Sequence, residues 1–144
     1  MALRIAHWVS RLALAAIFLY SGYLKLQSTL QFAATLSSHR LLPTPVILPV
    51  ATYLPWVEIA LGALLLTGWQ IRWVARAAAG LLALFLAILV VTHLRGIEAD
   101  CGCFGVGDRI SRWTLARDAL FLAGAIFLSV PGRQTPGQSS SRVT

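Results

Sequence analysis

Apolar residues run through this chain in long blocks rather than in the short periodic patterns of soluble helices and strands. Four stretches, 8–26, 46–68, 74–94 and 114–130, are apolar for roughly twenty residues each, the length that an α-helix needs to cross a bilayer. The pattern predicts an all-α integral membrane protein with a bundle of four transmembrane helices. The far end of the first stretch, YSGYLKL, is polar and no small-residue cleavage site follows it, so we expect a retained helix rather than a signal peptide.

The segments between these stretches predict one further helix and a tail. The first connection, QSTLQFAATLSSHRLLPTP, is long enough for a short amphipathic helix at the membrane interface. Pro45, Pro49 and Pro55 indicate either an interrupted second span or a span that begins after the first two prolines. Residues 132–144 are rich in Pro, Gly and Ser and predict a disordered tail, which leaves 1–131 as one transmembrane domain.

Charge supports the membrane assignment and leaves orientation open. Only 12% of the residues are charged, whereas a soluble domain carries about a quarter. The net charge of +7 is explained by arginines at helix ends that meet anionic headgroups, so no nucleic-acid partner is expected. The basic residues divide evenly between the two sides of the predicted bundle, and the positive-inside rule therefore decides nothing.

The only two cysteines, Cys101 and Cys103, lie one glycine apart in the connection before the last span, EADCGCFGVGD. A disulfide between them would close a small strained ring, and strain makes a disulfide easier to reduce. It would restrict the unfolded chain very little, so a purely structural bond is a poor explanation. The spacing therefore favours reversible redox exchange, which belongs on the oxidising face of a membrane. This places the cysteine loop outside and both termini in the cytoplasm of a bacterial inner membrane.

Metal binding is the alternative chemistry for the same pair. Two thiolates, with His93 at the end of the preceding span, are ligands that suit a soft metal such as Zn or Cu(I). A closed zinc site needs four ligands, and no second pair follows at a metal-site spacing, although two chains together would supply four thiolates. A pair without chemistry stays open as well.

Several ionisable residues should gather near the cysteines at the outer rim of the bundle. They are Lys25 at the end of the first span, His93 and Arg95 at the end of the third, and Arg117 and Asp118 at the start of the fourth. Cations near thiols favour the attacking thiolate. Taken singly, the basic residues are also explained by contact with lipid headgroups, and Asp118 by the dipole of its helix.

Glu58 lies inside the second predicted span. A carboxylate at that depth is costly, so it should face the bundle interior with a partner. Lys25 is the expected partner.

Three stretches in this order, RLALAAIFLYSGYLKL, YLPWVEIALGALLLTG and RGIEADCGCFG, resemble the MauE branch of the MauE/DoxX group of redox-associated membrane proteins. The resemblance covers roughly 11–127. It implies a role in methylamine utilisation, where the family is thought to help mature the disulfide-rich small subunit of methylamine dehydrogenase beside a thioredoxin-like partner. It carries the redox role onto Cys101 and Cys103, and lesser family positions onto Gly22, Lys25, Glu58 and Gly62.

The four-helix plan is also similar to membrane oxidoreductases of the DsbB and vitamin K epoxide reductase type. Those enzymes use two thiol pairs in relay, whereas this chain has one pair. The resemblance implies a quinone as electron acceptor or donor, and an apolar pocket near Trp56 and Glu58 would suit its ring.

Two functions of different classes follow from these observations. The first is a membrane thiol:disulfide oxidoreductase that exchanges electrons with a periplasmic or extracellular thioredoxin-fold protein and with quinone. The second is a non-enzymatic assembly factor or soft-metal carrier that uses the same cysteine pair.

Overall fold

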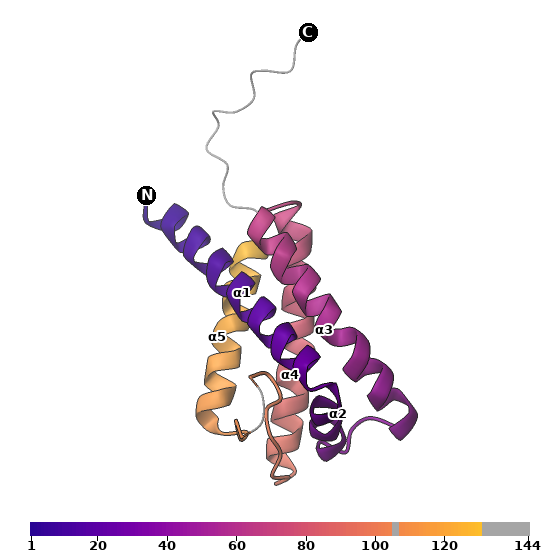
Figure 1. The fold of residues 1–144 in the computed structure, drawn as a ribbon. Coiled ribbons are helices and arrows are strands. Elements are labelled where there is room, and N and C mark those ends of the chain that lie inside the picture. The colour runs from indigo at the N-terminus through magenta and orange to yellow at the C-terminus, as the bar shows by residue number, and fades with distance from the viewer. Residues whose placement is uncertain (105–106, 131–144) are drawn as a thin grey trace.

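The computed structural model describes residues 1–104 and 107–130, and Figure 1 shows how their helices are arranged. Within these residues the chain is helical, with one isolated bridge between Asp100 and Arg109. The described part of the chain forms five helices: α1 (Ala2–Gln27), α2 (Thr29–Ser38), α3 (Thr44–Thr67), α4 (Ile71–Leu94) and α5 (Arg112–Ser129).

Three of these helices, α1, α3 and α4, are long and apolar enough to cross a membrane. They contain or closely match the first three predicted spans, so the protein is an all-helical membrane protein. The fourth expected span corresponds to α5, which has 18 residues and carries three charged residues, Arg112, Arg117 and Asp118. Helix α2 is the short helix predicted in the first connection. The predicted tail at 132–144 lies outside the described residues.

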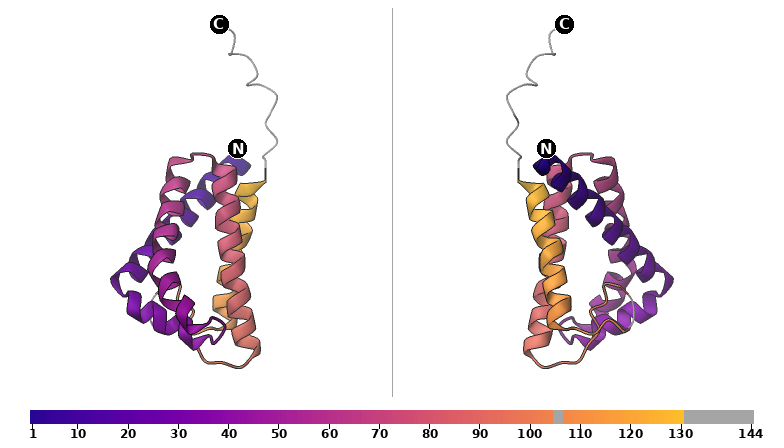
Figure 2. Two further views of the ribbon diagram at one scale, coloured as in Figure 1. Left: turned by 90° about the vertical axis from the view of Figure 1, so that its right-hand side faces the viewer. Right: turned by 90° about the vertical axis from the view of Figure 1, so that its left-hand side faces the viewer.

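The helices form two pairs that diverge toward one end of the molecule. Figure 2 shows α1 beside α3 and α4 beside α5, with α2 and the segment between α4 and α5 at the wider end. The start of α1 and the end of α5 lie toward the opposite end (Figure 1). The main core joins the two pairs through Leu14, Leu65, Val74 and Leu128, among others.

Two glycines allow α1 and α3 to pack closely. A Cβ on Gly22 would lie 2.7 Å from Ile59 Cγ1 and 2.9 Å from the Pro55 carbonyl oxygen. A Cβ on Gly62 would lie 2.8 Å from Leu19 Cγ. Small residues permit such contact between membrane helices, and this close contact brings Glu58 on α3 up to α1.

The prolines do not interrupt α3. Pro45 lies in its first turn, and Pro49 and Pro55 lie inside the continuous helix Thr44–Thr67. The helix therefore starts before all three, and the suggestion that Pro45 and Pro49 precede it is wrong.

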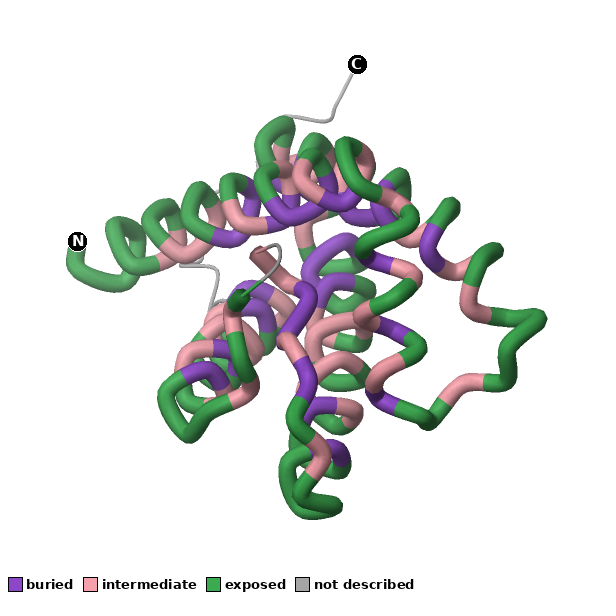
Figure 3. The backbone as a smooth tube through the Cα atoms, turned by 60° about the horizontal axis from the view of Figure 1, so that its bottom comes forward, coloured by how far each residue is buried: buried purple, intermediate pink, exposed green. Residues whose placement is uncertain are grey.

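The outward faces of the helices carry large apolar side chains. In Figure 3 the buried positions follow the inward faces, while most outward positions are exposed. Exposed side chains include Leu12 on α1, Val57 on α3 and Leu84 on α4. Apolar surface of this extent suits contact with lipid.

Candidate functional site

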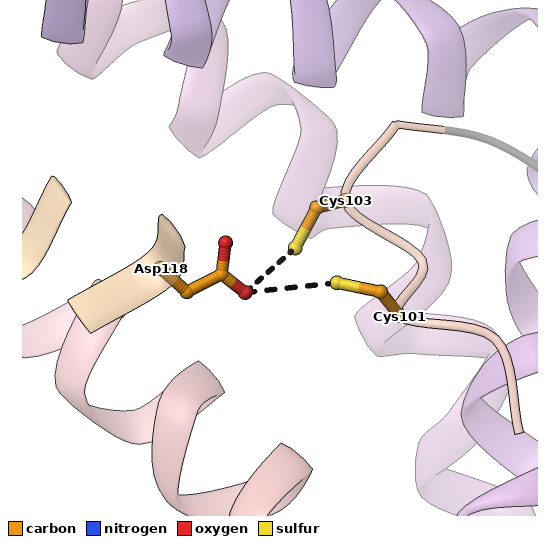
Figure 4. Close-up of side chains that lie close together, drawn as sticks. All are labelled: Cys101, Cys103 and Asp118. Atoms are coloured by element: carbon orange, nitrogen blue, oxygen red, sulfur yellow. Dashed lines mark hydrogen bonds between the residues drawn. The ribbon is translucent and has the colours of Figure 1, made fainter. Parts of the chain in front are cut away.

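The two cysteines converge on one carboxylate oxygen. The sulfur of Cys101 lies 3.7 Å from Asp118 Oδ2 and that of Cys103 lies 4.0 Å from the same atom. Figure 4 shows both side chains, from the segment between α4 and α5, pointing toward Asp118 on α5. Both are free thiols; Cys101 is fully buried and Cys103 is half-buried. The two sulfurs and a carboxylate oxygen all lie within 4.8 Å of one another.

Backbone hydrogen bonds fix the cysteine segment. The Cys101 N–H donates to the Asp108 carbonyl at 2.7 Å, and the Ile110 N–H donates to the Ala99 carbonyl at 3.1 Å. Between the cysteines, Gly102 has φ +74, and a Cβ there would lie 3.0 Å from Thr35 Cγ2. This left-handed conformation against α2 favours glycine. The glycine therefore lets the chain turn so that both thiols point the same way.

Among the described residues, Arg117 is the cation that contacts a thiol. Its Nη2 lies 3.9 Å from the Cys101 sulfur and 3.0 Å from Asp108 Oδ2, and its Nε lies 3.4 Å from Asp118 Oδ1. The guanidinium carbon also lies 4.7 Å from the centre of the Phe104 ring. Two carboxylates and a ring thus hold this guanidinium against Cys101.

The two thiols have different electrostatic surroundings. A hydrogen bond with Cys101 and burial raise the pKa of Cys103 well above its usual range, and the negative charge of Asp118 raises it further. Cys103 therefore resists loss of its proton.

A buried ion pair lies between α1 and α3. Lys25 Nζ is 2.6 Å from Glu58 Oε1, and the two side chains are 4% and 7% exposed. Lys25 also donates to Ser21 Oγ at 2.8 Å, and Ser21 donates to Glu58 Oε2 at 3.3 Å. The Lys25 ammonium lies 5.0 Å and 5.2 Å from the ring centres of Phe32 and Phe85. The structure thus forms the pair predicted from the sequence.

A small cavity separates the thiols from this ion pair. Cys103 and Asp118 line one part of it, Ser21 and Glu58 another, and apolar side chains such as Phe104 line the remainder. Its volume is about 30 Å³, which holds about one water molecule. Pockets for organic ligands measure about 300–1,000 Å³. The cavity therefore does not fit a quinone ring in this conformation.

The structure places three predicted site residues away from the thiols. His93 and Arg95 are exposed. His93 lines a separate groove of about 630 Å³, together with residues of α2 and of the segment between α4 and α5. Trp56 is 60% exposed and is not among the residues lining the cavity beside Glu58. Of the ionisable residues expected near the cysteines, Asp118 and Arg117 are the ones that contact the thiols within the described residues.

Two features near the site were not predicted. The first is Asp108, which forms an ion pair with Arg117. Its place in a glycine-rich loop gave no sequence signal for that contact. The second is buried His39, whose Nδ1 lies 3.1 Å from Thr92 Oγ1. Thr92 donates its own hydroxyl proton to the Ile88 carbonyl at 2.7 Å, so His39 must donate to Thr92 from a protonated Nδ1. Burial lowers the pKa of His39.

The helices have exposed apolar faces, and a pair of thiols lies at the wider end of the molecule. Together these features define a helical membrane protein with a candidate site for thiol chemistry. The profile of the family described as methylamine utilisation protein MauE matches residues 3–131. The chain therefore belongs to the MauE family, as its motifs suggested.

Individual relatives agree with this family. The chain is 38% identical over 123 residues to methylamine utilization protein MauE from Paracoccus versutus, a match that covers 83% of this chain and 66% of that protein. It is 33% identical over 139 residues to the protein of the same name from Paracoccus denitrificans, with 90% and 75% covered. The first match thus spans slightly less than two thirds of that relative's length. Comparison with solved structures finds no significant match.

Proposed function

We propose that this protein is a membrane thiol:disulfide oxidoreductase that acts in a MauE-type maturation of disulfides. Its Cys101–Cys103 pair would exchange two electrons with a thioredoxin-fold partner outside the cytoplasmic membrane. In one direction, the disulfide of the pair oxidises a dithiol of the partner: the pair becomes a dithiol and the partner gains a disulfide. In the other direction, the dithiol of the pair reduces a disulfide of the partner. Atoms and electrons balance without a further reactant.

The observation that carries this proposal is the convergence of both thiols on Asp118. Sulfurs that share one acceptor oxygen at 3.7 and 4.0 Å need only a local movement to bond to each other. The carboxylate accepts a hydrogen bond only while a thiol keeps its proton. A thiol pair with its own proton acceptor and an adjacent guanidinium is equipped for exchange.

We place the protein in a bacterial inner membrane with four spans, in which α5 is the fourth. Support comes from the position of α5 beside α4 (Figure 2) and from the segment between α4 and α5 lying at the end opposite the start of α1 (Figure 1). An even number of spans puts both termini on one side, in the cytoplasm, and the cysteine segment outside, where disulfides persist.

Coupling to quinone belongs to the proposal as a separate prediction. The cavity beside Cys103 is too small for the ring in this conformation, so no step of the proposed exchange passes through a quinone. Binding would require aromatic side chains such as Phe104 and Phe121 to move apart. Redox cycling of the purified protein with added quinone tests this coupling.

The proposed function is tested by cysteine replacement in a host that depends on the protein for growth on methylamine. Cys101→Ser, Cys103→Ser and the double variant should each abolish that growth while the protein still reaches the membrane. A single variant should also accumulate a reducible cross-link to a thioredoxin-fold protein. Full growth with the double variant would disprove the oxidoreductase function.

A second candidate function is a soft-metal carrier or assembly factor, favoured by one observation. Cys101, Cys103 and Asp118 present three ligand atoms within 4.8 Å of one another, and thiolates bind Zn or Cu(I). Asp118 replaces His93 as the third ligand suggested by the sequence. Equilibrium dialysis of the reduced protein against Zn²⁺ tests it. Retention of one equivalent that the double serine variant loses would support this function.

A further inference from the structure

We propose that the two cysteines have different roles in the exchange. Cys103 is the sulfur that joins a partner in a mixed disulfide, and Cys101 is the sulfur that leaves and later closes the intramolecular bond. This inference rests on the proposed function and holds for either direction of electron flow.

Access distinguishes the two sulfurs first. Cys101 has an exposed fraction of 0% and is fixed by its own N–H bond to the Asp108 carbonyl. Cys103 is half-buried and borders the cavity between the helix pairs. An incoming sulfur must approach along the line of the bond that it breaks, so it needs free space beside the sulfur it attacks. Among the described residues, Cys103 lines the cavity and Cys101 does not.

Electrostatics distinguish them in the same sense. The Asp118 carboxylate contacts both sulfurs, at 3.7 Å for Cys101 and 4.0 Å for Cys103. Among the described residues the guanidinium of Arg117 contacts the Cys101 sulfur, at 3.9 Å, and makes no such contact with Cys103. A neighbouring cation stabilises a thiolate, and the sulfur with the more stable thiolate leaves faster. Arg117 therefore favours departure of Cys101.

The exchange can be written so that every bond is accounted for. A partner thiolate attacks Cys103 of the disulfide; a bond forms between the partner sulfur and Cys103, and the Cys101–Cys103 bond breaks. Cys101 takes the electron pair as a thiolate beside Arg117. The partner's second thiolate then attacks the partner's first sulfur and releases Cys103. Protons from the partner's two thiols end on Cys101 and Cys103, which then both donate to Asp118. In the reverse direction, the Cys101 thiolate attacks the mixed disulfide at Cys103.

The test uses glutathione as the attacking thiol and the full-length protein in detergent. Oxidised protein is mixed with reduced glutathione and quenched within the first turnover by N-ethylmaleimide. Trypsin cuts after Arg95 and Arg109, so both cysteines lie in the peptide GIEADCGCFGVGDR. Fragment ions from this peptide locate glutathione and maleimide separately.

Glutathione should occupy Cys103, with maleimide on Cys101, in excess over the reverse pattern by about tenfold, because access and leaving-group stability act together. Glutathione mainly on Cys101, or equally on both, would overturn the division of roles while leaving the proposed function intact. Absence of any intramolecular disulfide in the oxidised protein would overturn both.

Arg117 provides a second readout. Arg117→Gln should slow glutathione attack on the oxidised pair by about threefold and move its pH dependence, because the departing Cys101 thiolate loses its cation. Arg117→Lys should restore part of the rate. Arg112→Gln removes an exposed charge one to two turns earlier on the same helix and should change neither. Equal rates for Arg117→Gln and Arg112→Gln would contradict the role given to Arg117.

Discussion

Replacing only one member of the buried Lys25–Glu58 pair should destabilise the protein more than replacing both. Each charge is almost fully shielded from water, with side-chain exposures of 4% and 7% and a separation of 2.6 Å. At that separation two unit charges attract by about 6 kcal/mol for an effective dielectric constant of about 20. Most of this attraction offsets the cost of removing both ions from water.

The single variants Lys25→Met and Glu58→Met each leave one buried charge without its partner. We expect each to lower the free energy of unfolding by about 3–5 kcal/mol. The double variant Lys25→Met/Glu58→Met replaces the pair by apolar side chains of similar length and should lie within about 1 kcal/mol of the wild type. Ser21→Ala, the control, removes a neutral hydroxyl from the same cluster and should cost about 1 kcal/mol.

The assay is reversible unfolding in mixed micelles, followed by far-ultraviolet circular dichroism, for the wild type and the four variants. The double-mutant cycle gives the coupling energy between the two residues directly. Additive effects, or single variants that unfold like the wild type, would refute the assignment of Lys25 and Glu58 as a buried ion pair.

Three further predictions concern function, packing and pH. Glu58→Gln keeps the shape of the side chain and should slow turnover of the thiols more than it lowers expression; the opposite result would make Glu58 purely structural. Gly22→Ala and Gly62→Ala should each cost about 1–3 kcal/mol in the same unfolding assay, because their new methyl groups clash across α1 and α3. Gly80→Ala, with nothing within 4 Å of its Cβ, should unfold as the wild type does. Burial lowers the pKa of His39 below its unfolded value, near 6.5, so the unfolded chain binds the extra proton first. Stability should be full above that value and fall as the pH drops through it, and His39→Gln should weaken this dependence in unfolding curves at pH 5 and pH 7.5.

Topology is tested by labelling intact cells with a membrane-impermeant maleimide after reduction. Labelling of Cys103 is expected in cells and is predicted to disappear in Cys103→Ser. A thiol that reacts only with a permeant reagent would place the segment on the cytoplasmic side.

Much of the fold follows from patterns that the sequence displays directly. Long apolar runs have few structural solutions, and three of the four predicted spans appear as α1, α3 and α4. The Lys25–Glu58 pair was predictable because a carboxylate inside a span needs a partner and few cations were available at that depth. The expected fourth span is not among these three helices. Arg117 and Asp118 fall inside α5, where they lie beside the thiols.

The differences between the expected and the observed positions have local geometric causes. Trp56 and Glu58 are two residues apart on a helix, a rotation of about 200°, so both cannot face the same interior pocket. His93 lies in the last turn of α4 and Arg95 caps its C-terminal end. The chain then runs from residue 95 to residue 100 before it returns to the thiols, and both side chains are exposed. The contacts of Asp108 and His39 depend on that return path and on α2 packing, which no local pattern encodes.

The central claim, that Cys101 and Cys103 form a reversible redox pair, is tested most directly by equilibrating the purified protein with glutathione buffers of graded potential. After acid quenching and alkylation, intact mass gives the fraction in which both thiols are free. The account predicts a single two-electron transition between the dithiol and an intramolecular disulfide, absent from both single serine variants; a midpoint well above about −270 mV would identify an oxidant of its partner and one near or below that value a reductant. Two thiols that stay free at every potential, or that bond only between chains, would contradict the account.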